Sequence, residues 1–172
     1  MYYGEKLNSI SHLVGSVFSL VALGALLALS IPTGDPQMIV GYSVFGLTLV
    51  LLYTMSTLYH SFQAPRLKSV FKVLDHISIY LLIAGTYTPL MLISLANRSG
   101  ALILALVWIL AAIGTLSEVL LSGRAVKICQ LLIYLGMGWA CSLDLAGLRA
   151  ALPATGFLWL AAGGVTYTVG VI

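Results

Sequence analysis

The stretch around which this chain is organised is STLYHSFQAPRLKSVFKVLD, residues 56–75. One apolar run ends in Ser56 and His60, and the next apolar run begins at Asp75. A proline and several basic residues interrupt the hydrophobic pattern between them, which indicates a turn. The stretch is therefore predicted to be a hairpin that brings an imidazole and a carboxylate to one face of a membrane.

The composition places most of the remaining chain in lipid. Of 172 residues, 60% are hydrophobic and 8% are charged, and the mean hydropathy is +1.07. Soluble domains are roughly half apolar and about a quarter charged, so a soluble fold would lack its polar exterior. The net charge of +3 comes from basic residues scattered between apolar runs, which suits loops that face anionic lipid. We expect no nucleic-acid partner.

Six apolar runs predict an all-α, polytopic transmembrane helix bundle that forms one integral membrane domain over residues 1–172. A helix needs about 20 apolar residues to cross the hydrocarbon core. The expected spans cover residues 12–31, 38–62, 73–95, 101–121, 126–145 and 155–172. Pro89 predicts a kink in the third span, where Thr86 or Thr88 could satisfy a freed carbonyl. The sixth run ends at Ile172, and we expect this last span to be incomplete.

The basic residues predict the orientation of the bundle. Six of the eight Lys and Arg residues fall on one side of the predicted topology, namely Lys6, Arg66, Lys68, Lys72, Arg124 and Lys127. Only Arg98 and Arg149 fall on the other side. Cytoplasmic loops carry the excess of Lys and Arg, so the amino terminus is predicted to be cytoplasmic. The residues of the 56–75 hairpin then lie near the cytoplasmic interface.

The polar residues of the hairpin each allow two interpretations. Ser56 and His60 are four residues apart and share one helical face, as a site pair would. The alternative is a serine that bonds a neighbouring helix and a histidine that lies at the membrane interface. Asp75 is either a cap at the start of a helix or a functional intramembrane carboxylate.

Several other polar residues are weighed in the same way. Glu5, Asn8 and His12 are spaced by three and four residues, so they could support the site from one helical face or simply cap the helix and meet water. His76 projects about 100° away from Asp75 around the helix, and we leave it outside the site. Glu118 lies either near the cytoplasmic headgroups or inside the bundle, and we expect a side chain that reaches the headgroups.

The polar residues in this order resemble a known family. The pattern Glu5-x2-Asn8-x3-His12, Ser56-x3-His60 and Asp75 is followed by IAGTYTP at residues 83–89 and YLGMGW at residues 134–139. This combination resembles the hemolysin III branch of the progestin and adipoQ receptor superfamily, over essentially the whole chain. The resemblance implies a seven-helix fold with a cytoplasmic amino terminus, located in a bacterial inner (plasma) membrane.

The same resemblance implies roles for individual residues. In that superfamily three histidines bind zinc near the cytoplasmic side, and the first of them matches His60. Ser56 and Asp75 match the serine and aspartate beside the metal and its bound water. The other two histidines belong to a carboxy-terminal H-x-x-x-H motif that these 172 residues lack. We therefore expect a chain cut before its seventh helix that binds zinc weakly or not at all, because catalytic zinc takes three protein ligands.

Three functions follow from the resemblance for the complete protein. The first is a zinc-dependent, ceramidase-like hydrolase of lipid amides or esters, with a role in membrane lipid homeostasis and membrane lipids as partners and substrate. Zinc chemistry of this kind activates a bound water near neutral pH. The second is a pore-forming cytolysin, as the branch name implies. The third is a membrane sensor or receptor without catalysis.

Overall fold

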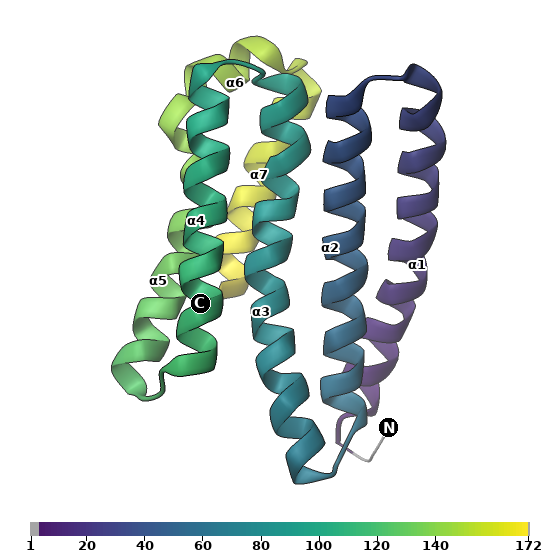
Figure 1. Ribbon diagram of the computed structural model, residues 1–172, viewed down its shortest axis with the longest axis vertical. Helices are drawn as coiled ribbons and strands as arrows, with labels where there is room; N and C mark the ends of the chain where they lie inside the picture. The colour runs from purple at the N-terminus through teal and green to yellow at the C-terminus, as the bar shows by residue number, and fades with distance from the viewer. Residues whose placement is uncertain (1–3, 172) are drawn as a thin grey trace.

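The computed structural model describes residues 4–171, and all the regular structure in that range is helical (Figure 1). Five helical segments within it are long and apolar enough to cross a membrane: Lys6–Thr33, Pro36–Ser61, Pro65–Ser94, Arg98–Leu120 and Arg124–Ala151. The predicted all-α transmembrane bundle is confirmed. The chain is an integral membrane protein.

Within the described residues, seven α-helices and three short irregular helices make up the bundle. The α-helices are α1 (Lys6–Ser30), α2 (Pro36–Ser61), α3 (Pro65–Pro89), α4 (Arg98–Leu120), α5 (Arg124–Gly138), α6 (Leu145–Ala151) and α7 (Ala154–Val171). The short elements are the 3-10 helices Ile31–Thr33 and Ala140–Asp144 and the π-helix Leu90–Ser94. In Figure 1, α2 lies between α1 and α3, while α4, α5 and α7 lie on the other side of α3.

The turn between α1 and α2 is as tight as its sequence predicts. Gly34 adopts a positive φ of 67° that a residue with a side chain would rarely take. Asp35 then caps α2, because its side chain accepts a hydrogen bond of 2.8 Å from the Gln37 amide. Pro36 occupies the first turn, where a missing amide hydrogen costs nothing. The two helices are consequently antiparallel neighbours.

Helix α3 begins well before the apolar run that it contains. Its first residue is Pro65, whereas the expected span began at residue 73. Proline suits the first helical position, and Arg and Lys are good helix formers outside the membrane, so the helix extends beyond the apolar part. Asp75 consequently lies almost three turns inside α3. The interpretation of Asp75 as a cap at a helix start is therefore wrong.

The backbone is irregular around Pro89, as the sequence predicts. Pro89 ends the α-helical part of α3, and the π-helix Leu90–Ser94 follows it directly. The hydroxyls of Thr86 and Thr88 donate to the carbonyls of Leu82 and Ala84 at 2.8 and 2.9 Å. They do not donate to the Gly85 carbonyl, whose helical partner the proline removes. A π-helix thus follows the position where the sequence predicts a kink, and the threonines bond other carbonyls.

The fifth apolar run is not one continuous helix. Helix α5 ends at Gly138, and the chain passes through a 3-10 turn into the short helix α6. Asp144 caps α6 by accepting a 2.9 Å hydrogen bond from the Gly147 amide. Two glycines near the end of α5 lower its helix propensity. The helix therefore ends at Gly138, although the apolar run continues to residue 145.

The buried core lies where α3 meets α4, α5 and α6. Tyr80 and Ala84 of α3, Val107 of α4, Met137 of α5 and Leu148 of α6 are almost fully buried. Many large apolar side chains on the outer faces remain exposed, for example Phe18 and Leu29 of α1 at 69% each. In a membrane protein such faces contact lipid. The bundle thus holds α3 firmly between its two halves, with polar side chains on both of its flanks.

Candidate functional site

The candidate site lies at one end of the bundle. The start of α1, the α2–α3 turn and the α4–α5 turn all lie at the lower end in Figure 1. The six basic residues that we assigned to one membrane side belong to these segments. Arg98 and Arg149, in contrast, belong to the first turn of α4 and the last turn of α6.

Ser56 and Asp75 form the centre of the site. Ser56 is a buried residue on α2, and its side chain lies within hydrogen-bonding reach of the Asp75 carboxylate on α3. The Ser78 hydroxyl donates to the Asp75 backbone carbonyl at 2.6 Å, one turn further along α3. Asp75 is half-buried between the two helices. The serine thereby fixes a carboxylate that a membrane would otherwise disfavour.

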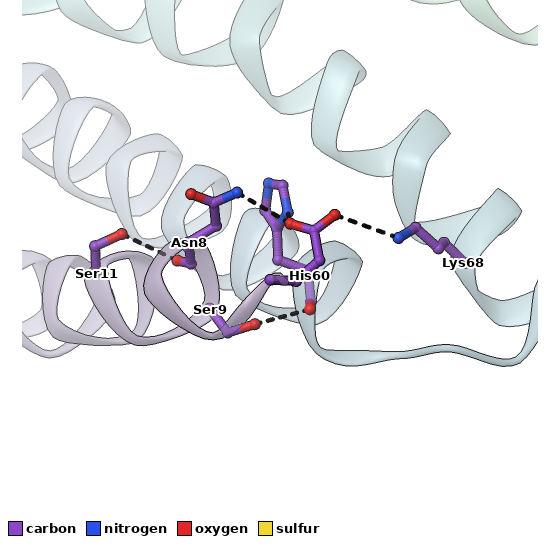
Figure 2. A network of polar contacts seen from close by, with 6 residues as sticks. Asn8, Ser9, Ser11, His60 and Lys68 are labelled. Atoms are coloured by element: carbon purple, nitrogen blue, oxygen red, sulfur yellow. Dashed lines mark hydrogen bonds and ion pairs between the residues drawn. The ribbon is translucent and has the colours of Figure 1, made fainter. Parts of the chain in front are cut away.

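His60 lies one turn below Ser56 and contacts the start of α1. Its Nδ1 atom lies 2.8 Å from the Oε2 atom of Glu5, and its backbone carbonyl accepts a 2.8 Å hydrogen bond from the Ser9 hydroxyl. Glu5 also accepts a 3.0 Å hydrogen bond from the Asn8 amide. The Nζ atom of Lys68 on α3 lies 3.6 Å from the other oxygen of Glu5. Figure 2 shows how these contacts join three helices.

His12 lies on the same face of α1. Its ring stacks on the His60 ring, with centroids 5.5 Å apart and an interplanar angle of 13°. The Asp75 carboxylate is close enough to both imidazoles to interact with them electrostatically. The structure thus brings the predicted residues of α1, α2 and α3 together. Their catalytic, metal-binding or supporting roles stay predictions.

The charge on Glu5 is stabilised by its neighbours. The hydrogen bond from Asn8 contributes most to a pKa of the Glu5 carboxyl below its ordinary value, followed by the hydrogen bond with His60. Desolvation acts in the opposite direction, and the charges of His60 and Lys68 lower the pKa further. Glu5 is therefore held as a carboxylate that anchors His60.

His76 and Glu118 form a separate pair on the other flank of α3. The Nδ1 atom of His76 bonds to Oε1 of Glu118 on α4, and the Tyr134 hydroxyl of α5 donates to the His76 carbonyl at 3.1 Å. The Glu118 side chain is only 11% exposed. Our expectation that Glu118 reaches the headgroups is wrong, because an imidazole of α3 satisfies this carboxylate inside the bundle.

Sequence reasoning missed the contributions of Ser9 and Lys68. Ser9 is fully buried against the end of α2, and Lys68 completes the charge balance around Glu5. Neither residue belongs to a motif with a regular spacing. The sequence offered two weak signals. Ser9 places a hydroxyl in the helical turn between Asn8 and His12, and Lys68 is a cation that could pair with Glu5.

The described residues do not by themselves fit a zinc site. Within residues 4–171, no three His, Cys, Asp or Glu side chains are arranged to hold a metal ion. Glu5 occupies Nδ1 of His60 and leaves only Nε2 of that ring to bind a metal, and the His12 ring is parallel to the His60 ring instead of converging with it on a common point. The site therefore offers one histidine that could bind a metal, His60, and one carboxylate held nearby, Asp75.

Comparison with known proteins gives consistent matches along the whole chain. A family model described as "Haemolysin-III related" matches residues 2–172. The chain is 39% identical over 168 residues to "Hemolysin-3" of Bacillus cereus, which covers 98% of this chain and 76% of that protein. It is 37% identical over 168 residues to "Hemolysin-3 homolog" of Bacillus subtilis (strain 168), covering 98% of this chain and 78% of the relative. No solved structure matches.

Proposed function

Because the chain belongs to the haemolysin-III related family, we propose that it acts on the lipids of a bacterial plasma membrane and, in the complete protein, hydrolyses a lipid amide or ester at the Ser56–His60–Asp75 site. Through this reaction it would contribute to membrane lipid homeostasis. The observation that carries the proposal is the convergence of Asp75, Ser56 and His60 from two adjacent helices.

The chemistry of these residues supports hydrolysis. A half-buried carboxylate can orient a water molecule and accept its proton while the water attacks a carbonyl carbon. Ser56 keeps the Asp75 carboxylate in one position. The imidazoles of His60 and His12 lie on the same side and can stabilise negative charge that develops there. A lipid substrate would enter from the bilayer between helices.

We also propose zinc as the cofactor of the complete protein, with His60 as one ligand. The support is the Glu5 carboxylate at Nδ1 of His60, since carboxylates commonly orient metal-binding imidazoles in this way. A bound zinc ion would supply Lewis-acid chemistry and a water of lowered pKa. The other protein ligands would come from outside residues 4–171, because these residues lack a three-donor group.

Hydrolysis is tested by Asp75→Asn in the full-length protein reconstituted in vesicles. We expect release of fatty acid from lipid amides and esters to fall about 100-fold or more, as when a general base is removed. Asp35→Asn is the matched control, because Asp35 caps α2 at the far end of the bundle and asparagine caps equally well. Wild-type rates in Asp75→Asn on every lipid amide and ester tested would exclude this mechanism.

The zinc proposal is tested by metal analysis of two purified forms. The 172-residue chain should hold much less than one zinc per molecule, because it offers too few ligands. The full-length protein should hold about one zinc, and His60→Ala should remove most of it. Stoichiometric zinc in the 172-residue chain, or unchanged zinc in full-length His60→Ala, would contradict the assignment.

A second candidate function is membrane permeabilisation, which the name of the Bacillus cereus relative suggests for that protein. A pore would release small dyes from vesicles faster than large ones and would be indifferent to Asp75→Asn and to chelators. Size-dependent release of this kind without lipid hydrolysis would favour the pore over the enzyme. Ligand-dependent conformational change without product or dye release would favour a sensor.

A further inference from the structure

A hollow of about 410 Å³ lies between α3, α4 and α5, on the flank of α3 opposite Asp75. Its polar lining comes from Ser69, Lys72 and His76 of α3, Glu118 of α4, and Lys127, Gln130 and Tyr134 of α5. Ser56, His60 and Asp75 do not line it. Its lining residues on α4 and α5 lie close to the α4–α5 turn, at the same end of the bundle as that site.

The polar groups at the floor of the hollow are hydrogen-bonded to other residues of the protein. The Glu118 carboxylate is bonded to His76, and the Tyr134 hydroxyl donates to the His76 carbonyl. Gln130 is buried, and its amide donates a 3.3 Å hydrogen bond to the Ser117 hydroxyl. The floor therefore has a fixed shape, and its single carboxylate is paired with an imidazole.

Two lysines line the hollow. Lys72 and Lys127 come from different helices and are both exposed. Within residues 4–171, neither ammonium group takes part in an ion pair with a carboxylate. The hollow thus combines two cations with a single carboxylate that is hydrogen-bonded to His76, and this excess of positive charge is complementary to an anion.

Exposed apolar side chains of α5 adjoin the hollow. Leu131 lines the hollow and is 42% exposed, and Ile128 and Leu132 beside it are more than half exposed. These side chains continue from the hollow along the outer face of α5. An anion bound between the lysines could therefore remain attached to an acyl chain that lies against α5.

We propose that this hollow binds the phosphate of an anionic membrane phospholipid, with Lys72 and Lys127 on either side of the phosphate and an acyl chain along Leu131. The charge complementarity, the position at the helix ends and the adjoining apolar side chains of α5 together favour a lipid over a free anion. This site does not depend on the proposed hydrolysis, because the two sites share no side chain.

The test uses the full-length protein in nanodiscs that contain phosphatidylglycerol in phosphatidylcholine. After exchange into detergent, native mass spectrometry counts the phosphatidylglycerol molecules that stay bound. The double variant Lys72→Gln/Lys127→Gln should retain phosphatidylglycerol roughly tenfold less well than the wild type. Lys72→Arg/Lys127→Arg should restore retention, since it keeps both charges.

The matched control is Arg66→Gln/Arg124→Gln. These arginines are exposed on the first turns of α3 and α5 and lie outside the hollow, so this variant removes the same charge from the same helices. It should retain phosphatidylglycerol like the wild type. Equal loss in both glutamine variants, or no loss in either, would overturn the proposal. Displacement of the lipid by millimolar inorganic phosphate would assign the site to a free anion and overturn it as well.

Discussion

At the scale of single residues, Glu5 does more than its place at the edge of the chain suggests. It bonds Asn8 within its own helix, His60 on α2 and Lys68 on α3. Three helices are thereby joined by one carboxylate at the end of the bundle. The stability of this end should therefore depend on whether Glu5 is ionised.

The pH dependence of this contribution has a definite sign. The pKa of Glu5 is lower in the folded protein than its ordinary value, so its contribution is fully present above about pH 4.3. It is lost as the pH falls through the folded pKa. In melting curves recorded in detergent, the wild type should have a higher melting temperature than Glu5→Gln at pH 6. This difference in melting temperature should shrink towards pH 3.

The control for this experiment is Arg66→Gln, a charge change at an exposed position on the first turn of α3. This variant should show the same change in melting temperature between pH 6 and pH 3 as the wild type. If Glu5→Gln melted like the wild type at every pH, the carboxylate would not join these helices in solution.

Residue spacing predicts only part of this network of contacts. Ser56 and His60 are four residues apart on one helix, so their common face could be predicted from the sequence. Glu5 and His60 are 55 positions apart, and no local rule pairs them. Asp75 was recognised as unusual because carboxylates are costly in membranes. The contact of Glu118 with His76 was missed because it depends on how α3 faces α4.

At the scale of helices, α2 and α3 approach closely at glycines. A side-chain carbon on Gly41 of α2 would lie 2.9 Å from the Cα atom of Pro89 on α3. Backbone atoms cannot move aside as a flexible side chain can. The same helix pair also meets at Gly85, where an added carbon would collide with Thr48. Small residues of this kind permit close helix packing in membranes.

Gly41→Ala should therefore destabilise the protein by about 1–3 kcal/mol, the usual cost of overpacking. A fall of several degrees in the melting temperature in detergent would reveal it. Gly24→Ala on α1 is the control, because an added carbon there meets no neighbour within 4 Å. That variant should be neutral or up to about 1 kcal/mol more stable, since alanine favours helices. Equal melting of the two variants would contradict the close approach.

Hydropathy located the apolar runs better than the helix ends. It reports where a segment meets lipid, so it could not show that α3 starts at Pro65, outside the apolar run. It also could not show that α5 gives way to a 3-10 turn after Gly138. Propensity and capping decide those boundaries, and both act over a few residues only.

At the scale of the whole molecule, the basic residues are distributed unequally between the two ends of the bundle. The end that carries both polar sites holds most of them, while Arg98 and Arg149 lie on segments at the other end. We propose that the end with both sites is cytoplasmic, because cytoplasmic segments carry the excess of positive charge.

Cysteine labelling tests this orientation. In a chain with Cys129 and Cys141 replaced by alanine, Ser99→Cys at the start of α4 should react with a membrane-impermeant maleimide on intact cells. Ser122→Cys in the α4–α5 turn should react only after the cells are opened. Both positions are exposed, so access to the reagent depends on the side of the membrane. The reverse pattern would show the opposite orientation.

Asp75 and His76 are consecutive residues that face different helices, the first towards α2 and the second towards α4. A rotation of α3 about its axis would therefore move the side chains on both of its flanks at once. A turn that moved Asp75 relative to Ser56 would swing His76 relative to Glu118 through the same angle. A ligand on one flank that favoured a particular rotation would change affinity on the other flank, and the second ligand would return the effect by an equal factor.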